Sequence, residues 1–173
     1  MAQTAEFKCP SPGTIVEFSD GQRTTWVGQE GNVCRLQQKR ADGTEAATNW
    51  YAPTALLPAG ASSAWATQVK PSTLWPLSVG KKISARYDGP GQDPGFSGSW
   101  TIAITVEKYE TVTTKAGTFG AFVVMFQSDQ IGRSFRTVFR QWYAPDPGVT
   151  VKFEFSTAND TQRRSGEAVS IRR

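Results

Sequence analysis

The alternation of apolar and polar positions is most regular in residues 115–155, where three strand-like runs follow one another. The first run, Phe119–Gln127, is apolar at both sets of alternating positions, which is typical of a strand covered on both faces. The last run, Val149–Phe155, has apolar side chains at every second position and polar ones between them, as a half-buried strand does. We expect these runs to form the sheet that organises the fold.

The middle run, Ser134–Tyr143, predicts two faces of different character, because successive side chains of a strand point to opposite sides. The first face carries Phe135, Thr137, Phe139, Gln141 and Tyr143. The second face carries Ser134, Arg136, Val138, Arg140 and Trp142.

Similar short runs, separated by turns rich in Gly, Asp and Pro, continue on both sides of this region. Before it, strands are expected at Thr14–Phe18, Arg23–Val27, Val33–Arg40 and Thr44–Tyr51. Further strands are expected at Lys81–Tyr87, Ser99–Lys108 and Glu167–Ile171, and Thr111–Ala116 leads into the central region. Residues 1–12 are expected to form a tail, and Ala61–Val69 to form a short helix. The pattern therefore predicts an all-β protein of about ten strands.

A length of 173 residues fits one domain, with two candidate sub-sheets inside it. Residues 13–51 and 77–172 carry strand patterns, whereas the Pro- and Ala-rich segment 52–76 interrupts them and is expected to be a linker or a flap. The tetrapeptide Trp-Tyr-Ala-Pro occurs at residues 50–53 and again at 142–145. Because the spacings around the two copies differ, we interpret them as a degenerate duplication rather than a regular repeat.

The net charge of +4 is concentrated in residues 130–173. The simpler interpretation is a solvated basic edge that aids solubility and discourages strand pairing, and the alternative is a surface for an anionic partner. The basic residues of this segment are Arg133, Arg136, Arg140, Lys152, Arg163, Arg164, Arg172 and Arg173, against the acidic Asp146, Glu154, Asp160 and Glu167.

The two cysteines, Cys9 and Cys34, both lie in the first fifth of the chain. One pair without metal-like spacing, flanking a predicted hairpin, predicts a disulfide, with buried free thiols as the alternative. Residues 1–4 have neither the basic nor the apolar region of a signal peptide, yet Ala2-Gln3-Thr4 is typical of a mature terminus left after cleavage. We therefore expect a periplasmic or secreted protein whose signal peptide has been removed.

The sequence contains no histidine, which removes the most common general base and the most common zinc ligand. Two carboxylate pairs, Glu107 with Glu110 and Asp88 with Asp93, are close in sequence, but acidic residues in or beside turns are commonly only solvated. The glycine-rich loop 89–95 lacks the Lys-Ser/Thr of a phosphate-binding loop and has too few carboxylates for calcium.

Two further classes are disfavoured by the pattern of the chain. No run of about 18 apolar residues is present, so no transmembrane segment is expected. No basic stripe is interleaved with aromatic residues along one element, so a nucleic-acid partner is not expected. Together with the missing histidine, the sequence predicts a protein that is not an enzyme and uses no cofactor or metal.

The remaining chemical lead is the aromatic content of six Trp, ten Phe and four Tyr. These side chains either fill a core or line a concave apolar face that takes a ligand. Arg136 and Arg140 share a strand face with Trp142, so an arginine–aromatic ladder that binds an anionic or sugar ligand is a further alternative. The predicted ligand-binding residues are Trp100, Phe122, Phe126, Arg136, Arg140, Trp142 and Tyr143.

Three motifs in the last hundred residues resemble a broad group of uncharacterised bacterial periplasmic proteins. They are WPLSVGKK from Trp75, AGTFGAFVV from Ala116, and WYAPDPGVTVKFEF from Trp142. Such proteins look like relatives of the LolA/LolB lipoprotein carriers, and this resemblance implies an open β half-barrel wrapped around a hydrophobic cavity. The motifs are turn and strand signals without a catalytic residue, so the function that they imply is an analogy.

The predicted fold is therefore an antiparallel all-β open half-barrel or sandwich with at most one short helix. The predicted function is a non-enzymatic periplasmic or secreted protein that binds a hydrophobic or lipid-like ligand or a partner protein. The alternative is a structural or accessory subunit of a larger envelope-associated or extracellular assembly. A cavity of roughly several hundred Å³ would favour the first function, and a filled core with an exposed apolar patch would favour the second.

Overall fold

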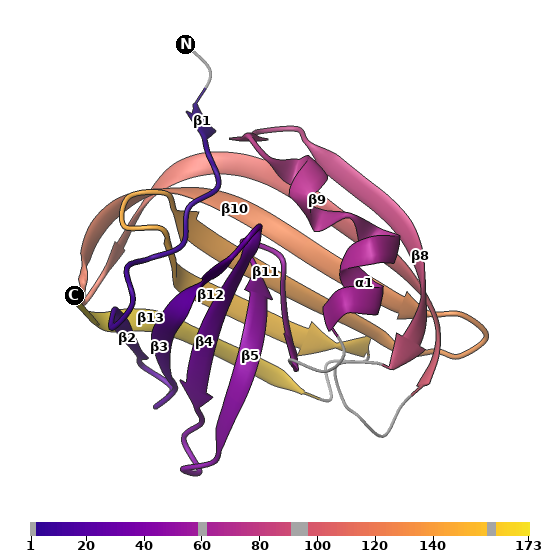
Figure 1. Ribbon diagram of the computed structural model, residues 1–173, viewed down its shortest axis with the longest axis horizontal. Helices are drawn as coiled ribbons and strands as arrows, with labels where there is room; N and C mark the ends of the chain where they lie inside the picture. The colour runs from indigo at the N-terminus through magenta and orange to yellow at the C-terminus, as the bar shows by residue number, and fades with distance from the viewer. Residues whose placement is uncertain (1–2, 59–61, 91–96, 159–161) are drawn as a thin grey trace.

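The computed structural model describes residues 3–58, 62–90, 97–158 and 162–173, which form strands, one α-helix and one 3-10 helix (Figure 1). The first elements are β1 (Thr4–Ala5), β2 (Ile15–Phe18), β3 (Arg23–Glu30), β4 (Val33–Lys39), β5 (Glu45–Tyr51), β6 (Ala55–Pro58), α1 (Ser62–Val69), η2 (Pro71–Leu74) and β7 (Leu77–Ser78). The remaining elements are β8 (Lys82–Pro90), β9 (Ser97–Thr114), β10 (Gly117–Gln130), β11 (Arg136–Ala144), β12 (Val149–Thr157) and β13 (Arg163–Arg172).

Eleven of these strands form one antiparallel sheet in the order β6-β5-β4-β3-β2-β13-β12-β11-β10-β9-β8. Its edge strands β6 and β8 do not pair with each other, so the sheet curves without closing (Figure 1). This arrangement confirms the predicted all-β, open antiparallel fold with one short helix. The helix expected at Ala61–Val69 is α1.

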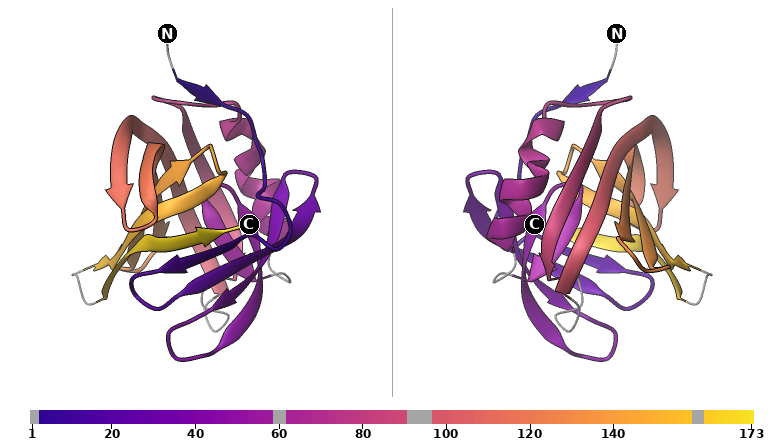
Figure 2. Two further views of the ribbon diagram at one scale, coloured as in Figure 1. Left: turned by 90° about the vertical axis from the view of Figure 1, so that its left-hand side faces the viewer. Right: turned by 90° about the vertical axis from the view of Figure 1, so that its right-hand side faces the viewer.

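Strand β13 joins the two expected sub-sheets by changing its partner halfway along. Its first half, residues 163–167, pairs with β12, and its second half, from Ala168 onward, pairs with β2. The register shifts at the start of the second half, and such irregularities bend and twist a strand. The sheet turns at this point, so that β2–β5 form one wall and β8–β12 form the other (Figure 2).

Segment 52–76, expected as a linker or a flap, instead contributes β6, α1 and η2. Helix α1 ends at Val69 because Lys70 adopts a left-handed conformation (φ 54°) directly before Pro71, which cannot continue a helix. The buried Trp65 of α1 contacts both walls, with its ring 5.3 Å from that of Tyr51 and 6.4 Å from that of Phe126. The helix therefore fills one end of the space between the walls.

Helix α1 also covers the edge of the sheet. The side-chain amide of Gln68 donates to the main-chain oxygen of Asp88 (3.1 Å), and its oxygen accepts from the Asp88 N–H (2.8 Å). This pair of bonds imitates a neighbouring strand, and it satisfies backbone groups that an edge strand otherwise leaves open to a second chain.

The central strand β10 has the alternation that the sequence predicts. Phe122, Val124 and Phe126 lie opposite Tyr143, Gln141 and Phe139 of β11, and all three are buried. They therefore point to the same side of the sheet, toward α1 and the opposite wall.

The N-terminal segment differs from the expected tail, because it is held to the rest of the protein at three places, one of them in the large sheet. Strand β1 pairs with β7, Phe7 packs edge-on against Trp75 with 5.4 Å between the rings, and Cys9 is bonded to Cys34 of β4. The disulfide predicted from the sequence is confirmed. The Phe7 ring and the Cys9–Cys34 bond hold this segment in place, although most of residues 1–12 do not form a hydrophobic pattern.

Candidate functional site

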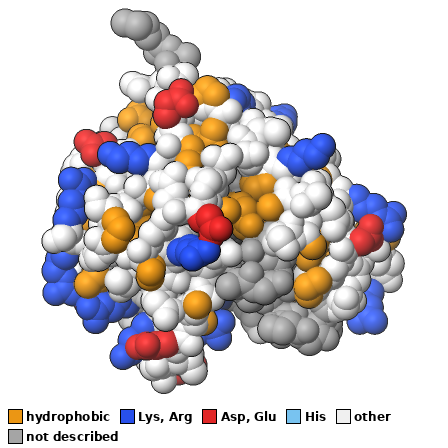
Figure 3. Space-filling view, in the orientation of Figure 1, with side chains coloured by type: hydrophobic (Ala, Val, Ile, Leu, Met, Phe, Trp, Pro, Cys, Tyr) orange, Lys and Arg blue, Asp and Glu red, His pale blue; other side chains and the backbone are white. Residues whose placement is uncertain are grey.

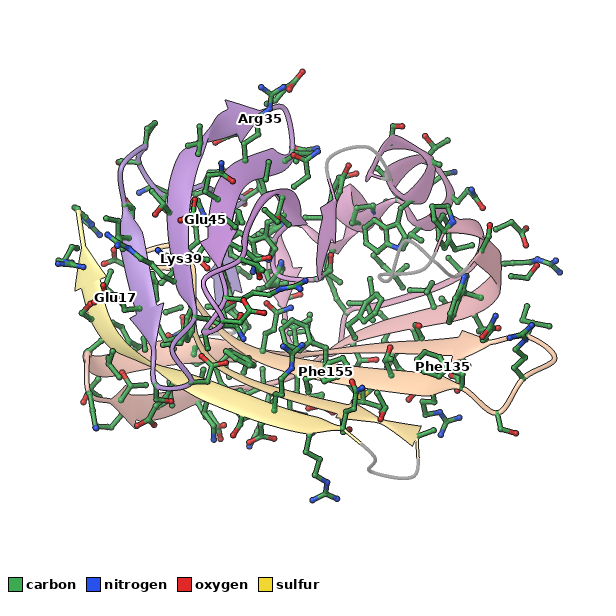
Figure 4. All side chains as sticks on the ribbon, turned by 90° about the horizontal axis from the view of Figure 1, so that it is seen from below. Glu17, Arg35, Lys39, Glu45, Phe135 and Phe155 are labelled. Carbon is green, nitrogen blue, oxygen red and sulfur yellow. A yellow bond between two sulfur atoms is a disulfide. The ribbon has the colours of Figure 1, made fainter. Side chains whose placement is uncertain are left out.

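A cleft of about 260 Å³ lies between the wall formed by β2–β5 and strands β11 and β12 of the other wall, with the start of β13 beside them. This volume lies just below the roughly 300–1,000 Å³ that small-molecule sites span. Figure 4 shows the two walls from below, with Phe155 placed between them. The aromatic lining residues are Phe18, Trp26, Trp50, Phe139, Phe153 and Phe155.

Phenylalanines from β11, β12 and β2 form a continuous ladder of ring contacts, although β13 lies between β12 and β2 in the sheet. The Phe153 ring lies 5.4 Å from that of Phe18 and 5.9 Å from that of Phe139, which lies 6.4 Å from that of Phe155. Phe139 and Phe155 are only half-buried, although Phe153 between them is buried. The exposed parts of these rings provide apolar surface on which a ligand can lie.

Gly166 of β13 makes room for the ladder. A Cβ at this position would lie 2.6 Å from Cε1 of Phe153, which is closer than real Cβ contacts, so the bare backbone allows the ring to lie across the strand. Residues 153 and 166 are direct partners in the pairing of β12 with β13. Gly166 therefore sets the position of the buried Phe153 ring, which the half-buried rings of Phe139 and Phe155 follow in the ladder.

The opposite wall of the cleft is built from indoles and short polar side chains. Trp26 and Trp50 are buried, with 6.0 Å between their rings. Neither indole N–H has a hydrogen-bond partner among the described residues. The polar residues that line the cleft are Gln22, Thr24, Gln38, Thr48, Gln141 and Thr150.

Gln141 is the most deeply buried of these polar residues, and its side chain is fully used within the protein. Its amide nitrogen donates to the main-chain oxygens of Pro53 (3.0 Å) and Thr54 (2.6 Å), and its oxygen accepts from the Thr150 hydroxyl (3.0 Å). Gln141 therefore positions the wall and offers no spare donor to a ligand.

Two arginines, Arg40 and Arg164, are the only charged residues among the described residues that line the cleft. Both are exposed, and the guanidinium carbon of Arg164 lies 5.3 Å from the centre of the Phe155 ring. Neither arginine forms an ion pair within the described part of the chain. Positive charge therefore lies at the exposed part of a cleft that is lined by aromatic and polar side chains.

Four of the predicted ligand-binding residues, Trp100, Phe122, Phe126 and Tyr143, point inward but belong to the packed core. Each is no more than 5% exposed, and none lines the described cleft. Tyr143 contacts the rings of Trp50 and Trp75, and burial raises the pKa of its hydroxyl well above the ordinary value. These residues behave as core side chains, the alternative that the sequence left open for them.

The other three predicted residues, Arg136, Arg140 and Trp142, lie on the outer face of β11, so the set is not one site. Arg136 pairs with Asp129 (2.5 Å) and Arg140 with Glu107 (2.7 Å), while the Trp142 indole donates to Glu110 (2.7 Å). Lys152 lies over the Trp142 ring at 4.3 Å. Trp142 cannot line the same face as Tyr143, because adjacent residues of a strand point to opposite sides.

The basic surplus of the C-terminal region is largely paired in the same way. Figure 3 shows basic side chains along the edge that carries the C-terminus in Figure 1. Lys152 pairs with Glu154 (3.3 Å), Arg172 pairs with Glu17 (2.7 Å), and Arg163 also has an interaction partner.

The cleft residues that sequence reasoning missed are the ladder members Phe139, Phe153 and Phe155, with Trp26 and Trp50 opposite them. Their alternation was visible in the sequence, since Phe139 shares a predicted face with Gln141, and Phe153 shares one with Phe155. What the sequence did not indicate is which inward-facing aromatic residues border open space.

The candidate carboxylate pairs are engaged in surface contacts. Glu107 accepts from Arg140, Glu110 accepts from Lys108 and Trp142, and Asp88 pairs with Arg86 and Ser99. Asp93 lies outside the described residues. No group of three or more potential metal ligands occurs in the described ranges, and no described helix has the length and apolarity needed to cross a bilayer.

Comparison with known proteins identifies no family for this chain. No protein-family model matches the sequence. No curated protein matches it either. The resemblance to the LolA/LolB carriers therefore stays a prediction.

Two solved structures are similar in fold. One is a provisionally assigned exported protein with a YmcC-like fold from Bacteroides fragilis NCTC 9343, with 14% identity and a TM-score of 0.47. The other is a provisionally assigned lipoprotein from Parabacteroides distasonis ATCC 8503, with 14% identity and a TM-score of 0.46. Each alignment covers 98% of this chain and 100% of the other.

Proposed function

We propose that this chain is a non-enzymatic binding protein that holds an apolar, lipid-like ligand in the cleft between its two sheet walls. The observation that carries the proposal is the phenylalanine ladder, in which Phe139 and Phe155 keep part of their rings open to a cleft of about 260 Å³. Trp65 and Tyr143 are buried completely, whereas Tyr109, Phe119 and Phe135 are also half-buried or exposed but do not line the cleft. Half-open aromatic surface in a concave site favours ligand binding over a purely structural role.

The chemistry of the lining supports binding without catalysis. The described lining residues carry amides, hydroxyls and guanidinium groups but no carboxylate, and the chain contains no histidine. A nucleophilic hydroxyl needs a neighbouring base to react near neutral pH, and none of these groups serves as one. The polar side chains are better suited to orienting a bound molecule.

A periplasmic or secreted location is part of the proposal and rests on the Cys9–Cys34 bond. Disulfides form and persist in oxidising compartments and are rare in the reducing cytosol. The bond ties the N-terminal segment to β4, which is one of the strands of the cleft wall. The disulfide therefore stabilises this wall when the cysteines are oxidised.

The test is the binding of N-phenyl-1-naphthylamine, an uncharged apolar dye, to the full chain and to the variant Ala46→Trp. Ala46 is exposed, lines the cleft, and lies on the same face of β5 as Thr48 and Trp50. An indole at this position therefore occupies the cleft without disturbing the core. We expect saturable binding by the full chain and its loss in the variant.

The matched control is Gln37→Trp. Gln37 is exposed, lies on the neighbouring strand β4 and is not a cleft residue, so it adds the same indole to the outward face. Equal dye binding by the two variants, both folded by circular dichroism, would refute the cleft as the binding site. No saturable binding by the unmodified chain would refute it as well.

A further inference from the structure

We infer that the cleft selects amphiphiles with an anionic headgroup, which Arg40 and Arg164 bind at its mouth while the tail lies on the phenylalanine ladder. This inference rests on the proposed function and deepens it, because it names the class of ligand. Its shared chemistry is a single apolar chain that ends in carboxylate or phosphate oxygens.

The two arginines of the cleft differ from the arginines elsewhere on the sheet in their partners. Arg136, Arg140 and Arg172 each pair with a carboxylate of the chain. Arg40 and Arg164 form no ion pair among the described residues. A guanidinium group presents a planar fork of donors that matches carboxylate and phosphate oxygens, so these two remain available to an external anion.

Arg164 lies at the end of the ladder. Residues 155 and 164 are direct partners in the pairing of β12 with β13, and the guanidinium lies over the Phe155 ring. This contact holds the Arg164 guanidinium beside the half-buried Phe155 ring. A ligand whose tail lies along Phe139 and Phe155 therefore places its headgroup beside the charge.

The main chain of Arg40 is fixed by hydrogen bonds within a turn. Arg40 follows β4 and is held in the tight β4–β5 turn, where its N–H donates to the Thr44 oxygen (2.8 Å) and its oxygen accepts from Gly43 (2.9 Å). Asp42 of the same turn already accepts two hydrogen bonds from Thr44, at 2.9 and 2.6 Å. Both bonds go to Oδ1, and they lower the pKa of Asp42, with a smaller contribution from the charge of Arg40. Asp42 thus interacts with Arg40 beyond ion-pair distance, and it does not line the cleft.

Asp20 of the β2–β3 turn is occupied in a similar way. Its two oxygens accept from the main-chain N–H and the side-chain amide of Gln22, at 3.1 and 2.6 Å. Among the described lining residues, the charge seen by an entering headgroup is therefore positive. Cationic amphiphiles find no carboxylate there, while anionic ones find two guanidinium groups.

The experiment is displacement of N-phenyl-1-naphthylamine by dodecyl compounds that differ only in the headgroup, each below its critical micelle concentration. The probes are dodecanoate, dodecyl phosphate, 1-dodecanol and dodecyltrimethylammonium. We expect the two anions to bind at least about tenfold more tightly than the cation, which corresponds to one charge-assisted hydrogen bond. Preference for dodecanoate or for dodecyl phosphate distinguishes a fatty-acid from a phosphate headgroup as the source.

The variant that tests the two arginines is Arg40→Gln/Arg164→Gln. It should remove the preference for the anions and leave the affinity for 1-dodecanol unchanged. The control Arg35→Gln removes the same charge from the outward face of β4, where Arg35 pairs with Glu30, and should keep the preference.

Two outcomes separate the inference from the proposed function. Equal displacement by all four headgroups, with dye binding still blocked by Ala46→Trp, would overturn the headgroup inference alone. Absence of dye binding to the unmodified chain, or binding that Ala46→Trp does not reduce, would overturn the proposed function together with it.

Discussion

The side-chain amide of Gln141 on β11 donates to the main-chain oxygen of Thr54 at 2.6 Å, although the two residues are 87 positions apart. Thr54 directly follows the first Trp-Tyr-Ala-Pro copy, and Gln141 directly precedes the second. The same amide also reaches Pro53. One buried side chain thus connects the two copies and fixes the segment that leads from β5 to β6 against the opposite wall.

Replacing Gln141 by leucine should lower the free energy of unfolding by about 3 kcal/mol, because buried main-chain oxygens lose their donor. Urea denaturation followed by tryptophan fluorescence measures this change. The control is Gln127→Leu, since Gln127 is half-buried on β10 and bonds only its near neighbour Asp129 among the described residues. We expect a loss below about 1 kcal/mol there, and equal losses would contradict the assigned role of Gln141.

Replacing Gly166 by alanine should destabilise the protein by about 1–3 kcal/mol, because the new Cβ meets the Phe153 ring at 2.6 Å. Thermal or urea unfolding measures the loss. The control Gly28→Ala lies on β3, where a Cβ has no neighbour within 4 Å, so it should be neutral or slightly stabilising.

A second substitution checks that the clash is with the ring. Adding Phe153→Leu to Gly166→Ala should cost less than the sum of the two single changes, because the smaller side chain makes room for the Cβ. Strict additivity would show that Gly166 acts for a different reason.

Removing the Cys9–Cys34 bond should lower the free energy of unfolding by about 3 kcal/mol, as expected for a loop closed across 25 residues. The double variant Cys9→Ser/Cys34→Ser should be as unstable as the reduced natural chain. Reductant should shift the urea midpoint of the natural chain and leave that of the double variant in place. A midpoint that reductant does not move in the natural chain would contradict the prediction.

The outer-face pair of Glu110 and Trp142 predicts a dependence of stability on acid. Hydrogen bonds from Lys108 and then from Trp142 hold the pKa of Glu110 below its ordinary value near 4.5. Because the pKa is lowered by folding, the stabilisation is present above the ordinary value and is lost as the pH falls through the lower, folded-state pKa. Glu110→Gln should remove this part of the pH dependence.

The Trp142 indole N–H resonance in a proton–nitrogen NMR spectrum gives a direct readout. Its chemical shift should titrate with a midpoint below 4.5, because protonated Glu110 is a weaker acceptor. The Trp100 indole, which is buried without a partner among the described residues, should not follow the same curve. A Trp142 resonance that does not move in this range would contradict the assigned bond.

Much of the fold was predictable from the sequence because the alternation of side chains along a strand depends only on neighbouring residues. The period-two alternation in β10, β11 and β12, the glycine at the Asp42-Gly43 turn and the paired cysteines indicate strands, turns and a disulfide without knowledge of the rest. The short strands β1 and β6 were missed, since neither has a hydrophobic pattern long enough to indicate pairing.

The sequence by itself determined which side chains of a strand share a face, as with Phe139 and Gln141 on one side of β11 and Arg140 and Trp142 on the other. Only the tertiary structure decided which inward faces border a cleft and which are filled, because coverage depends on segments distant in the chain. Trp65 of α1 covers Phe126, while Phe139 and Phe155 border the cleft that separates them from β3–β5 and remain half open. Alternation is a property of neighbouring residues, but the space in front of a face is set by how the whole sheet bends at β13.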